Sequence, residues 1–478
     1  MKFLRRLVEY LAPQRRSLGA RVLQAGGWSM VQILTTNILR LATNLIMTRY
    51  LVPEAFGLMA LVATLITAFN LLTDIGLSQS ISRDAEGDKD HFLRVAWTIK
   101  LMRGSLIAIS VLLVALLLWL LGPSLAPKGS IYTDSRLPAL LALSSFVPLM
   151  IGAESTAQEL ALRRLQNSRY TVIGITAHLS GVVSMLVFVQ MSPTVWALIF
   201  GMLTINLVAL IATHIFYPGP TMKLIWDTDI TNRLWNFGKF LMGSSIFTFV
   251  ARSADRFILA GLLGPTTFSL YAISLIWIEA GTMLIERLAN HVGFPAMSEV
   301  IRTRPYDLPR LFRKFQNFID ILCLSSFFLT FFLSSLVIDF LYSGEFENVG
   351  SYLTVLSVSF LILRFEMFNT LILNLGNSYS IMIISSIRAI AVCILVPTSL
   401  KFLGFTGALL AVALTPAITA PYSLILLRKI LGKRQILYGA AWIFVSIAVG
   451  IAIYIIMIDS IPVVMRSRLE SVGDLRYI

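Results

Sequence analysis

Five arginines lie inside long apolar stretches of this 478-residue chain, where their side chains are suited to holding phosphate or carboxylate oxygens. They are Arg40, Arg252, Arg256, Arg364 and Arg388. A guanidinium stays protonated and can grip an oxyanion through two parallel hydrogen bonds. A charged side chain at the centre of a membrane helix costs roughly 2.5–3.5 kcal/mol, so such a residue faces a cavity or a partner. These five residues are therefore candidates for binding an anionic substrate.

The sequence around these arginines offers few partners for their charge. Arg252 and Arg256 are four residues apart and share a helical face, and Asp255 lies on the same side. Arg40 and Arg388 have no acidic residue within one helical turn. A buried pair of Arg252 with Asp255 that only fixes helix packing is the alternative interpretation. The surplus of arginine favours an anionic ligand in a watery cavity.

Carboxylates inside apolar runs form a second group, which can take up a proton, hold Na⁺ or form structural pairs. These residues are Asp74, Asp255, Glu279 and Glu286. Glu279 and Glu286 are seven residues apart and share a helical face. For Glu286, a salt bridge at the helix end with nearby basic residues is the alternative. Glu366 lies two residues after Arg364, so these two side chains point to different faces.

The motifs that would indicate an enzyme or a bound cofactor are not found in the sequence. The nucleotide-binding pattern GxxxxGK[ST] is absent, so we do not expect the chain to hydrolyse ATP. We predict no catalytic residues, no metal site and no cofactor. An H⁺ or Na⁺ gradient acting through the carboxylates is the candidate driving force.

The composition indicates which elements must position these residues. The chain is 57% hydrophobic and only 13% charged, whereas soluble domains are about one quarter charged. Apolar runs long enough to cross a bilayer as helices recur along its whole length. We predict an all-α polytopic membrane protein with thirteen spans, at residues 24–49, 56–80, 97–121, 137–157, 171–190, 194–217, 237–262, 268–292, 317–343, 350–375, 380–401, 404–428 and 436–458.

Basic residues are distributed unevenly between alternate loops. With the N-terminus in the cytoplasm, the cytoplasmic loops carry 24 Lys and Arg residues and the outside loops carry 3. Such a bias sets the orientation of bacterial membrane proteins. The net charge of +14 therefore faces anionic membrane lipid, and we expect no nucleic-acid binding. The tail at 459–478, which thirteen spans would place outside despite its arginines, does not fit this pattern.

A weak internal repeat relates the two halves of the chain. When the sequence is shifted by 212 positions, "RLATNLIMTRYLVPEAFGLMA" (40–60) aligns with "RSADRFILAGLLGPTTFSLYA" (252–272). Arg40 then falls on Arg252, and Pro53 falls on Pro265. Six spans per repeat keep both halves in the same orientation, as in transporters whose halves are related by an axis along the membrane normal. We therefore expect Arg40 and Arg252 to face each other across two pseudo-symmetric six-helix lobes.

The repeat and the spans divide the chain into segments with different expected roles. The predicted segments are a basic amphipathic cytoplasmic N-terminus (1–23), an N-lobe (24–217), a cytoplasmic linker (218–236), a C-lobe (237–430), one extra helix (436–458) and a polar tail (459–478).

Several stretches, in order, resemble one family of membrane exporters. "TRYLVPEAFGLMAL" and "LTDIGLSQSISRD" (72–84) are similar to the start of Wzx-type polysaccharide flippases of the multidrug/oligosaccharidyl-lipid/polysaccharide (MOP) superfamily. "NFGKFLMGSSI" (236–246), "DRFILAGLLGPTTFSLYAIS" (255–274) and "GFPAMSEV" (293–300) resemble its colanic-acid-exporter branch. The resemblance covers about residues 20 to 430. The family usually has fourteen spans, one more than this chain.

The resemblance implies a bilobed, MATE-like transporter of the bacterial inner membrane. Such a protein moves an undecaprenyl-pyrophosphate-linked oligosaccharide to the outer leaflet by alternating access, for surface polysaccharides such as exopolysaccharide or lipopolysaccharide. Its expected partners are this lipid-linked substrate, membrane lipids and the polysaccharide polymerase machinery. Arg40 and Arg252 fall where the family has cationic cavity residues. Asp74 matches the acidic residue of a D-x-G segment, which can equally be a structural turn.

Three other functions are compatible with some of these features. A membrane polymerase or ligase would need a sizeable external loop, and the longest internal one expected here, near 122–136, has no His or carboxylate pair. A cation-coupled drug exporter would favour acidic and aromatic cavity residues over arginine. A lipid II-type flippase or other lipid-linked precursor flippase is the closest alternative, because its substrate carries the same pyrophosphate.

Overall fold

The computed structural model of the chain describes residues 18–164, 166–217, 219–288, 293–342 and 344–460. Within these ranges every regular element is a helix, which confirms the predicted all-α fold class. A bilayer core offers no water to backbone N–H and C=O groups, so a spanning chain must satisfy them within helices. Most of the predicted amphipathic N-terminus (1–23) and of the polar tail (459–478) lies outside the described residues.

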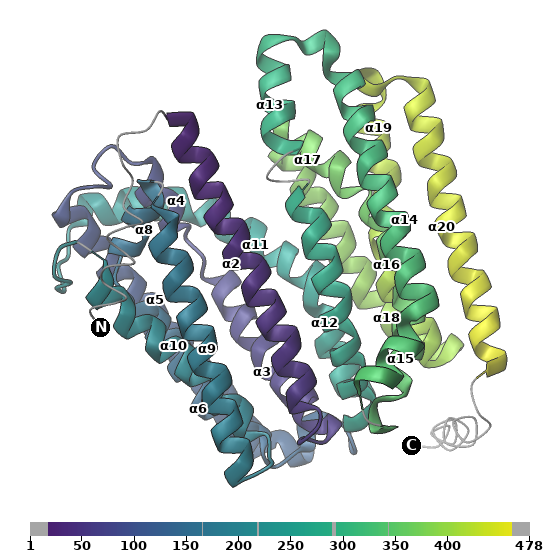
Figure 1. Cartoon of the computed structure of the whole chain (residues 1–478), viewed down its shortest axis with the longest axis horizontal. Helices are drawn as coiled ribbons and strands as arrows, with labels where there is room; N and C mark the ends of the chain where they lie inside the picture. The colour runs from purple at the N-terminus through teal and green to yellow at the C-terminus, as the bar shows by residue number, and fades with distance from the viewer. Residues whose placement is uncertain (1–17, 165, 218, 289–292, 343, 461–478) are drawn as a thin grey trace. The chain divides into compact units, whose positions relative to one another are not determined.

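The chain forms two compact units whose boundary falls inside one long helix, α11. Unit 1 contains residues 1–249 and 263–269, and unit 2 contains residues 250–262 and 270–478. Unit 1 is drawn from purple to teal in Figure 1. Its helices are α2 (Leu18–Met47), α3 (Pro53–Leu72), α4 (Leu77–Arg83), α5 (Asp90–Leu125), η1 (Ile131–Thr133), α6 (Leu137–Ser144), α7 (Phe146–Ala153), α8 (Ala157–Arg163), α9 (Asn167–Met191), α10 (Trp196–Phe216) and the first part of α11 (Thr228–Leu262).

Unit 2 begins with the last part of α11 and ends with the long helix α20. Its further elements are α12 (Pro265–Leu288), α13 (Phe294–Thr303), η3 (Pro305–Asp307), α14 (Leu308–Leu341), η4 (Gly344–Phe346), α15 (Asn348–Leu356), α16 (Val358–Leu363), α17 (Glu366–Asn374), α18 (Ser378–Leu414), η5 (Thr415–Thr419), α19 (Ala420–Leu431) and α20 (Lys433–Ser460). The predicted N-lobe, linker and C-lobe boundaries stay a prediction.

Helices cover all thirteen predicted spans, but fewer meet a strict test of length and hydropathy. In the described residues, nine stretches are long and apolar enough to cross a membrane, or ten if the bent pair α6–α8 is one span. The prediction counted α2 and α11 as spans, although polar side chains interrupt both. It also divided residues 379–431, which pass the test as a single stretch of 53 residues. The chain is a multi-pass membrane protein.

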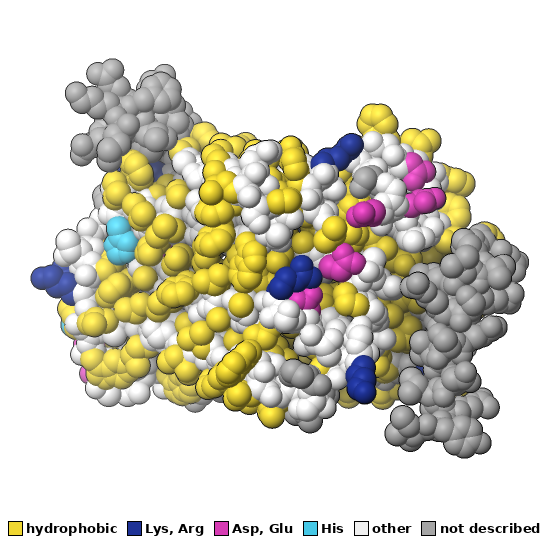
Figure 2. All heavy atoms as spheres, turned by 90° about the horizontal axis from the view of Figure 1, so that it is seen from below, with side chains coloured by type: hydrophobic (Ala, Val, Ile, Leu, Met, Phe, Trp, Pro, Cys, Tyr) yellow, Lys and Arg dark blue, Asp and Glu magenta, His cyan; other side chains and the backbone are white. Residues whose placement is uncertain are grey.

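Large apolar side chains cover much of the outer surface, which is the reverse of a soluble protein. The side chains of Trp119, Phe340 and Phe444 are exposed, and those residues have 67%, 80% and 74% relative exposure. The face in Figure 2 is mostly hydrophobic, with few charged side chains. An apolar surface of this extent is stable against lipid and would aggregate in water.

The repeat at an offset of 212 residues has a structural counterpart in the way two helices begin. Pro53 is the first residue of α3, and Pro265 is the first residue of α12. Proline suits this position because its missing N–H would have no partner in the first turn. The aligned Phe56 and Phe268 are both buried. The two aligned stretches therefore correspond to equivalent helix–turn–helix segments.

Two pairs of repeat-equivalent residues also touch each other within unit 1. The hydroxyl of Thr266 donates a hydrogen bond to Oε1 of Glu54, and these residues are 212 positions apart. Gly57 lies so close to Ser269 that a Cβ at Gly57 would come within 2.0 Å of the serine Oγ. A residue contacts its own equivalent only near a symmetry axis. The starts of α3 and α12 therefore meet in a pseudo-symmetric manner.

Several predicted spans are broken rather than straight. α18 bends at Gly404, whose φ of 71° is left-handed, so one helix ends there and another begins. This break separates the predicted spans 380–401 and 404–428. The prolines of "TPAITAP" fall at the starts of η5 and α19, where the helix tightens to a 3₁₀ turn. In unit 1, α6–α7 and α8 are bent by 57° at residues 154–156.

Candidate functional site

α11 and α12 form a helical hairpin that carries two of the predicted arginines and two of the predicted glutamates. Nη2 of Arg252 donates to Oε1 of Glu286 at 2.9 Å. One turn further along α11, Arg256 pairs with Glu279. The seven-residue spacing in α12 puts both glutamates on the face that packs against α11. The expected shared face of Glu279 and Glu286 is confirmed.

The third arginine–glutamate pair links α17 to α18. Nη1 of Arg388 donates to Oε1 of Glu366 at 2.8 Å, and its Nε donates to the hydroxyl of Thr419 at 3.1 Å. Glu366 also accepts a bond from the amide of Asn369 at 3.3 Å. The prediction that Arg388 is unpaired is wrong, because its partner comes from another helix and no sequence window around Arg388 contains it.

The Arg252–Glu286 and Arg388–Glu366 pairs belong to one charge network within unit 2. Arg252 interacts electrostatically with Glu366 as well as with Glu286, and Glu286 interacts with Arg388. We use the term charge network for these residues together with the adjacent pair: Arg252, Arg256, Glu279, Glu286, Glu366 and Arg388. Four helices supply them. The structure therefore brings together three of the five predicted arginines.

The charge network is balanced, yet it retains donors for an anion. Three guanidinium groups face three carboxylates, so the network carries no formal net charge at neutral pH. Arg252 makes a single hydrogen bond to Glu286, although a guanidinium has five N–H donors. Its side chain is 60% exposed. An oxyanion can therefore reach Arg252 without dismantling the helix packing.

Asp255 does not pair with Arg252, so the alternative interpretation of a buried pair of these two residues is wrong. Its carboxylate accepts a hydrogen bond from the hydroxyl of Tyr271, and both residues are buried. Its nearest cation is Arg256, the next residue in the chain. Residues 252 and 255 are about 60° apart around a helix of 3.6 residues per turn, so they share a face, but the Asp255 carboxylate is bonded to Tyr271 rather than to Arg252. Its predicted coupling role stays untested.

Arg364 lies in a separate, closed environment in unit 2. It has no exposed surface, its Nη2 lies 3.1 Å from Oδ2 of Asp320, and it stacks over the Trp442 ring with 4.4 Å between Cζ and the ring centroid. Asp320 also accepts a bond from Gln316 at 2.8 Å. Trp442 belongs to α20, so a cation–π contact ties this last helix to the rest of unit 2. The geometry favours a packing role for Arg364.

In unit 1, Arg40 and Asp74 have contrasting surroundings. Arg40 is exposed on α2 and forms no ion pair with the described residues. Asp74 accepts the backbone N–H of Gly76 at 3.0 Å, and Gly76 has a φ of 61°, so the D-x-G segment forms a tight turn. Arg103 approaches Asp74 at 3.8 Å. The structural-turn interpretation of Asp74 accounts for its geometry, and the facing of Arg40 and Arg252 stays a prediction.

The sequence analysis did not select two acidic residues that form ion pairs with the candidate arginines. Asp320 lies inside a predicted span, so the criterion that selected Asp74 would have found it. Glu366 was considered only as a neighbour of Arg364, and its actual partner is Arg388. No local signal marks that choice, because it depends on how α17 packs beside α18.

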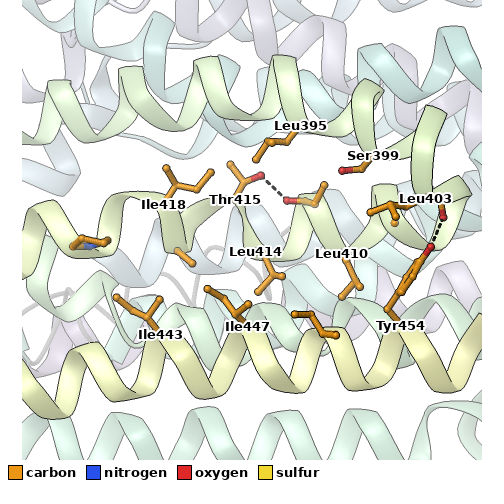
Figure 3. Close-up of a pocket in the computed structure, with 15 residues that line it drawn as sticks. Leu395, Ser399, Leu403, Leu410, Leu414, Thr415, Ile418, Ile443, Ile447 and Tyr454 are labelled. Carbon is orange, nitrogen blue, oxygen red and sulfur yellow. Dashed lines mark hydrogen bonds between the residues drawn. The ribbon is translucent and has the colours of Figure 1, made fainter.

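An apolar pocket in unit 2 lies apart from these charges. It has a volume of about 640 Å³ between α18, η5 and α20, and its lining residues include Leu395, Leu410 and Ile447. Figure 3 shows the labelled side chains of Leu414 and Ile443 directed towards the same space, with Thr415 and Tyr454 as polar members. No charged residue lines it, so this pocket offers nothing to hold a phosphate.

Comparisons with known proteins agree on a family and a fold. The model of a family described as "Polysaccharide biosynthesis protein" matches residues 46–351. A curated relative, the succinoglycan biosynthesis transport protein ExoT of Rhizobium meliloti (strain 1021), is 21% identical over 281 residues. The match covers 58% of this chain and 54% of that protein, so the chain spans about half the length of the relative.

Solved structures of three transporters share the fold at low sequence identity. The lipid II flippase MurJ, in an inward closed conformation, has a TM-score of 0.64 at 15% identity and covers 90% of this chain and 97% of its own. A MOP superfamily transporter from Pyrococcus furiosus Vc1 (DSM3638) has a TM-score of 0.63 at 15% identity, over 91% and 99%. An inward-facing multidrug resistance MATE transporter has a TM-score of 0.61 at 13% identity, over 87% and 98%.

These comparisons agree with the resemblance found in the sequence, and the family model covers well over half of the chain. The protein therefore belongs to the polysaccharide biosynthesis protein family, and its fold is that of MOP superfamily transporters.

Proposed function

We propose that this protein moves a lipid pyrophosphate-linked oligosaccharide across the bacterial inner membrane by alternating access, as a transporter rather than an enzyme. The family and the fold support transport in polysaccharide biosynthesis. We further propose that the N-terminus is cytoplasmic and that the carrier lipid is undecaprenol. The observation that carries the proposal is the charge network, with the partly exposed Arg252 at its edge.

The glutamates of the charge network act as replaceable counter-ions for the arginines. Without substrate, Glu286 and Glu366 neutralise Arg252 and Arg388, so neither of these two arginines is left without a counter-ion. When a pyrophosphate arrives, its oxygens take up the free N–H donors of the arginines and compete with the carboxylates. On release, the carboxylates pair again. Such exchange keeps the arginines paired both before the headgroup binds and after it leaves.

A second candidate substrate is lipid II or another lipid-linked precursor, because its headgroup has the same pyrophosphate chemistry. The fold shared with the lipid II flippase favours this alternative. The two candidates differ in the glycan beyond the pyrophosphate. A deletion strain distinguishes them, since the lipid-linked glycan that accumulates on the cytoplasmic side identifies the substrate.

Binding of a lipid pyrophosphate-linked oligosaccharide to purified protein tests the proposal. Arg252→Ala and Arg388→Ala should each weaken binding about ten- to a hundredfold, since a hydrogen bond to a charged group contributes roughly 1.5–3 kcal/mol. Arg310→Ala, which removes an exposed arginine at the start of α14, is the matched control and should bind normally. Wild-type binding by both network variants, with monodisperse protein, would rule out the charge network as the headgroup site.

A further inference from the structure

The break between α7 and α8 in unit 1 is held by polar groups from two neighbouring helices. α7 ends at Ala153 and α8 begins at Ala157, with a bend of 57° between the two helical segments. The indole Nε1 of Trp97 donates to the Ala153 carbonyl at 3.0 Å, and His214 Nε2 donates to the same oxygen at 2.9 Å. The hydroxyl of Thr213 accepts the N–H of Ser155 at 3.3 Å. The backbone groups at the break therefore have defined hydrogen-bond partners on α5 and α10.

Next to this break, one lysine lies between two glutamates. Nζ of Lys100 donates to Oε1 of Glu159 at 3.0 Å and lies 3.6 Å from Oε2 of Glu154. The three side chains are only 11%, 11% and 14% exposed. A close backbone approach brings α5 to α7, since a Cβ on Gly152 would lie 2.9 Å from the Lys100 carbonyl oxygen and 3.0 Å from the Cα of Gly104.

This glutamate–lysine cluster (Lys100, Glu154 and Glu159) has one carboxylate charge more than it has cations. Oε2 of Glu159 is buried without a hydrogen-bond partner, in a residue that is 8% exposed. The hydroxyl of Tyr217, in a residue 6% exposed, is also buried without one and interacts electrostatically with both glutamates. A buried charge without a partner is costly, so the unpartnered Oε2 of Glu159 favours the binding of a positively charged ligand.

Among the described residues, three neighbouring basic side chains make hydrogen bonds to backbone carbonyls rather than to the cluster. Arg169 on α9 donates to the Phe216 carbonyl at 3.5 Å, and its electrostatic interaction is with Tyr217. Arg163 on α8 is bonded to the carbonyls of Ile81 and Asp84. His214 on α10 donates to the Ala153 carbonyl, and Tyr170 on α9 interacts electrostatically with both glutamates and with Lys100.

We propose that the glutamate–lysine cluster is a proton-binding site at the broken helix α7–α8. On binding, a proton bonds to the unpartnered Oε2 of Glu159, while Lys100 remains paired with Glu154, so the cluster becomes neutral. On release, the same O–H bond breaks and the proton returns to water. Helix breaks lined by carbonyls and carboxylates are where transporters bind coupling cations.

A proton fits this site better than a metal cation does. The ammonium group of Lys100 already occupies the position between the carboxylates, and a second cation there would be repelled by it. Among the described residues, no group of three His, Cys, Asp or Glu side chains could hold a metal ion. A proton needs a single oxygen.

Infrared difference spectroscopy of the purified full chain tests this inference without any lipid substrate, and therefore independently of the proposed function. As the pH is lowered stepwise, wild type should gain a buried carboxylic-acid band from this cluster. Glu159→Gln and Glu154→Gln should each lose that band, because either change leaves a neutral pair. Glu345→Gln, an exposed glutamate in η4, is the matched control and should keep it.

Replacing the lysine provides a test with the opposite sign. In Lys100→Met the two carboxylates lose their shared cation, so the proton should bind at a pH higher by about one unit or more. An unchanged band in both glutamine variants would overturn the proposal, as would a band that disappears on adding Na⁺ at constant pH. If Glu159→Gln is not monodisperse, the band in Glu154→Gln and the pH shift in Lys100→Met still support or overturn the proposal.

Discussion

In unit 2, Nη2 of Arg252 lies 2.9 Å from Oε1 of Glu286, and this single bond joins the middle of α11 to the end of α12. Both side chains also interact with Glu366 of α17. Glu286 therefore competes with any anion for the same guanidinium. This competition gives the charge network consequences that can be measured.

Removing the competing carboxylate should strengthen substrate binding. In Glu286→Gln the neutral amide accepts a weaker bond from Arg252, so a lipid pyrophosphate should bind about three- to tenfold more tightly. This gain is smaller than the roughly 1.5–3 kcal/mol of a full charge-assisted bond. Titration of the purified variant with a lipid pyrophosphate-linked oligosaccharide measures the change. Weaker binding would mean that Glu286 positions Arg252 rather than competing for it.

The repeat-equivalent arginines should act on one ligand together. Arg40→Ala should weaken binding about ten- to a hundredfold, as expected for Arg252→Ala, and each Lys variant should lie between Ala and wild type, because lysine keeps the charge but loses the two-pronged geometry. The double Ala variant should lose less than the sum of the two single losses, since residues that grip one ligand are coupled. Strict additivity in a double-mutant cycle would place the two arginines on separate ligands.

The buried pair of Arg364 and Asp320 should matter for folding and little for binding. Asp320→Ala leaves a fully buried guanidinium without its carboxylate, which costs about 3–5 kcal/mol of stability. Thermal unfolding in detergent should show this loss. The control is Asp339→Ala, which removes an exposed carboxylate from the same helix and should unfold like wild type. A stable Asp320→Ala variant with impaired substrate binding would instead assign this pair to the transport site.

The pair of His91 and Asp227 at the start of α11 should make stability depend on pH. His91 and the backbone N–H groups of Ile230 and Asp229 lower the pKa of Asp227 below its usual 3.8. A carboxyl group whose pKa is lowered by folding stabilises the protein above its unfolded pKa, and this contribution is lost as the pH falls through the folded value.

Asp227→Asn should therefore be less stable than wild type near neutral pH, and the difference should be lost as the pH falls below 3.8 and through the lowered pKa of Asp227. Thermal unfolding at several pH values measures it. Asp88→Asn, in the exposed loop before α5, is the control and should follow the wild-type profile. A constant difference between Asp227→Asn and wild type at every pH would show that helix capping by the side chain, rather than ionisation, is responsible.

The membrane orientation has a direct test by reporter fusions. Fusions at about residues 88, 165, 228 and 306 should report a cytoplasmic location, and those at about 128, 192 and 346 a periplasmic one. The bias of Lys and Arg between alternate loops is the physical reason. One reversed position among these would show that a predicted span does not cross the membrane.

The sequence by itself determined the helical architecture, because a bilayer requires long apolar helices and proline marks where they begin. The spans predicted to begin at residues 56 and 268 lie on α3 and α12, which start at Pro53 and Pro265, and Gly404 falls at the break between two predicted spans. The arginines were also identified from the sequence, because a charged side chain within an apolar membrane helix is costly whichever helices pack against it. These properties depend on residue type and local spacing.

Only the tertiary structure decided which charges are paired. Arg252 pairs with Glu286 rather than with Asp255, Arg388 pairs with Glu366, and Lys100 lies between two glutamates more than fifty residues further along the chain. A helix fixes the face on which a side chain lies, but the partner on that face belongs to whichever helix packs there. That choice arises from the packing of distant segments, such as the close contact of Gly104 with Gly152, and a single sequence does not encode it locally.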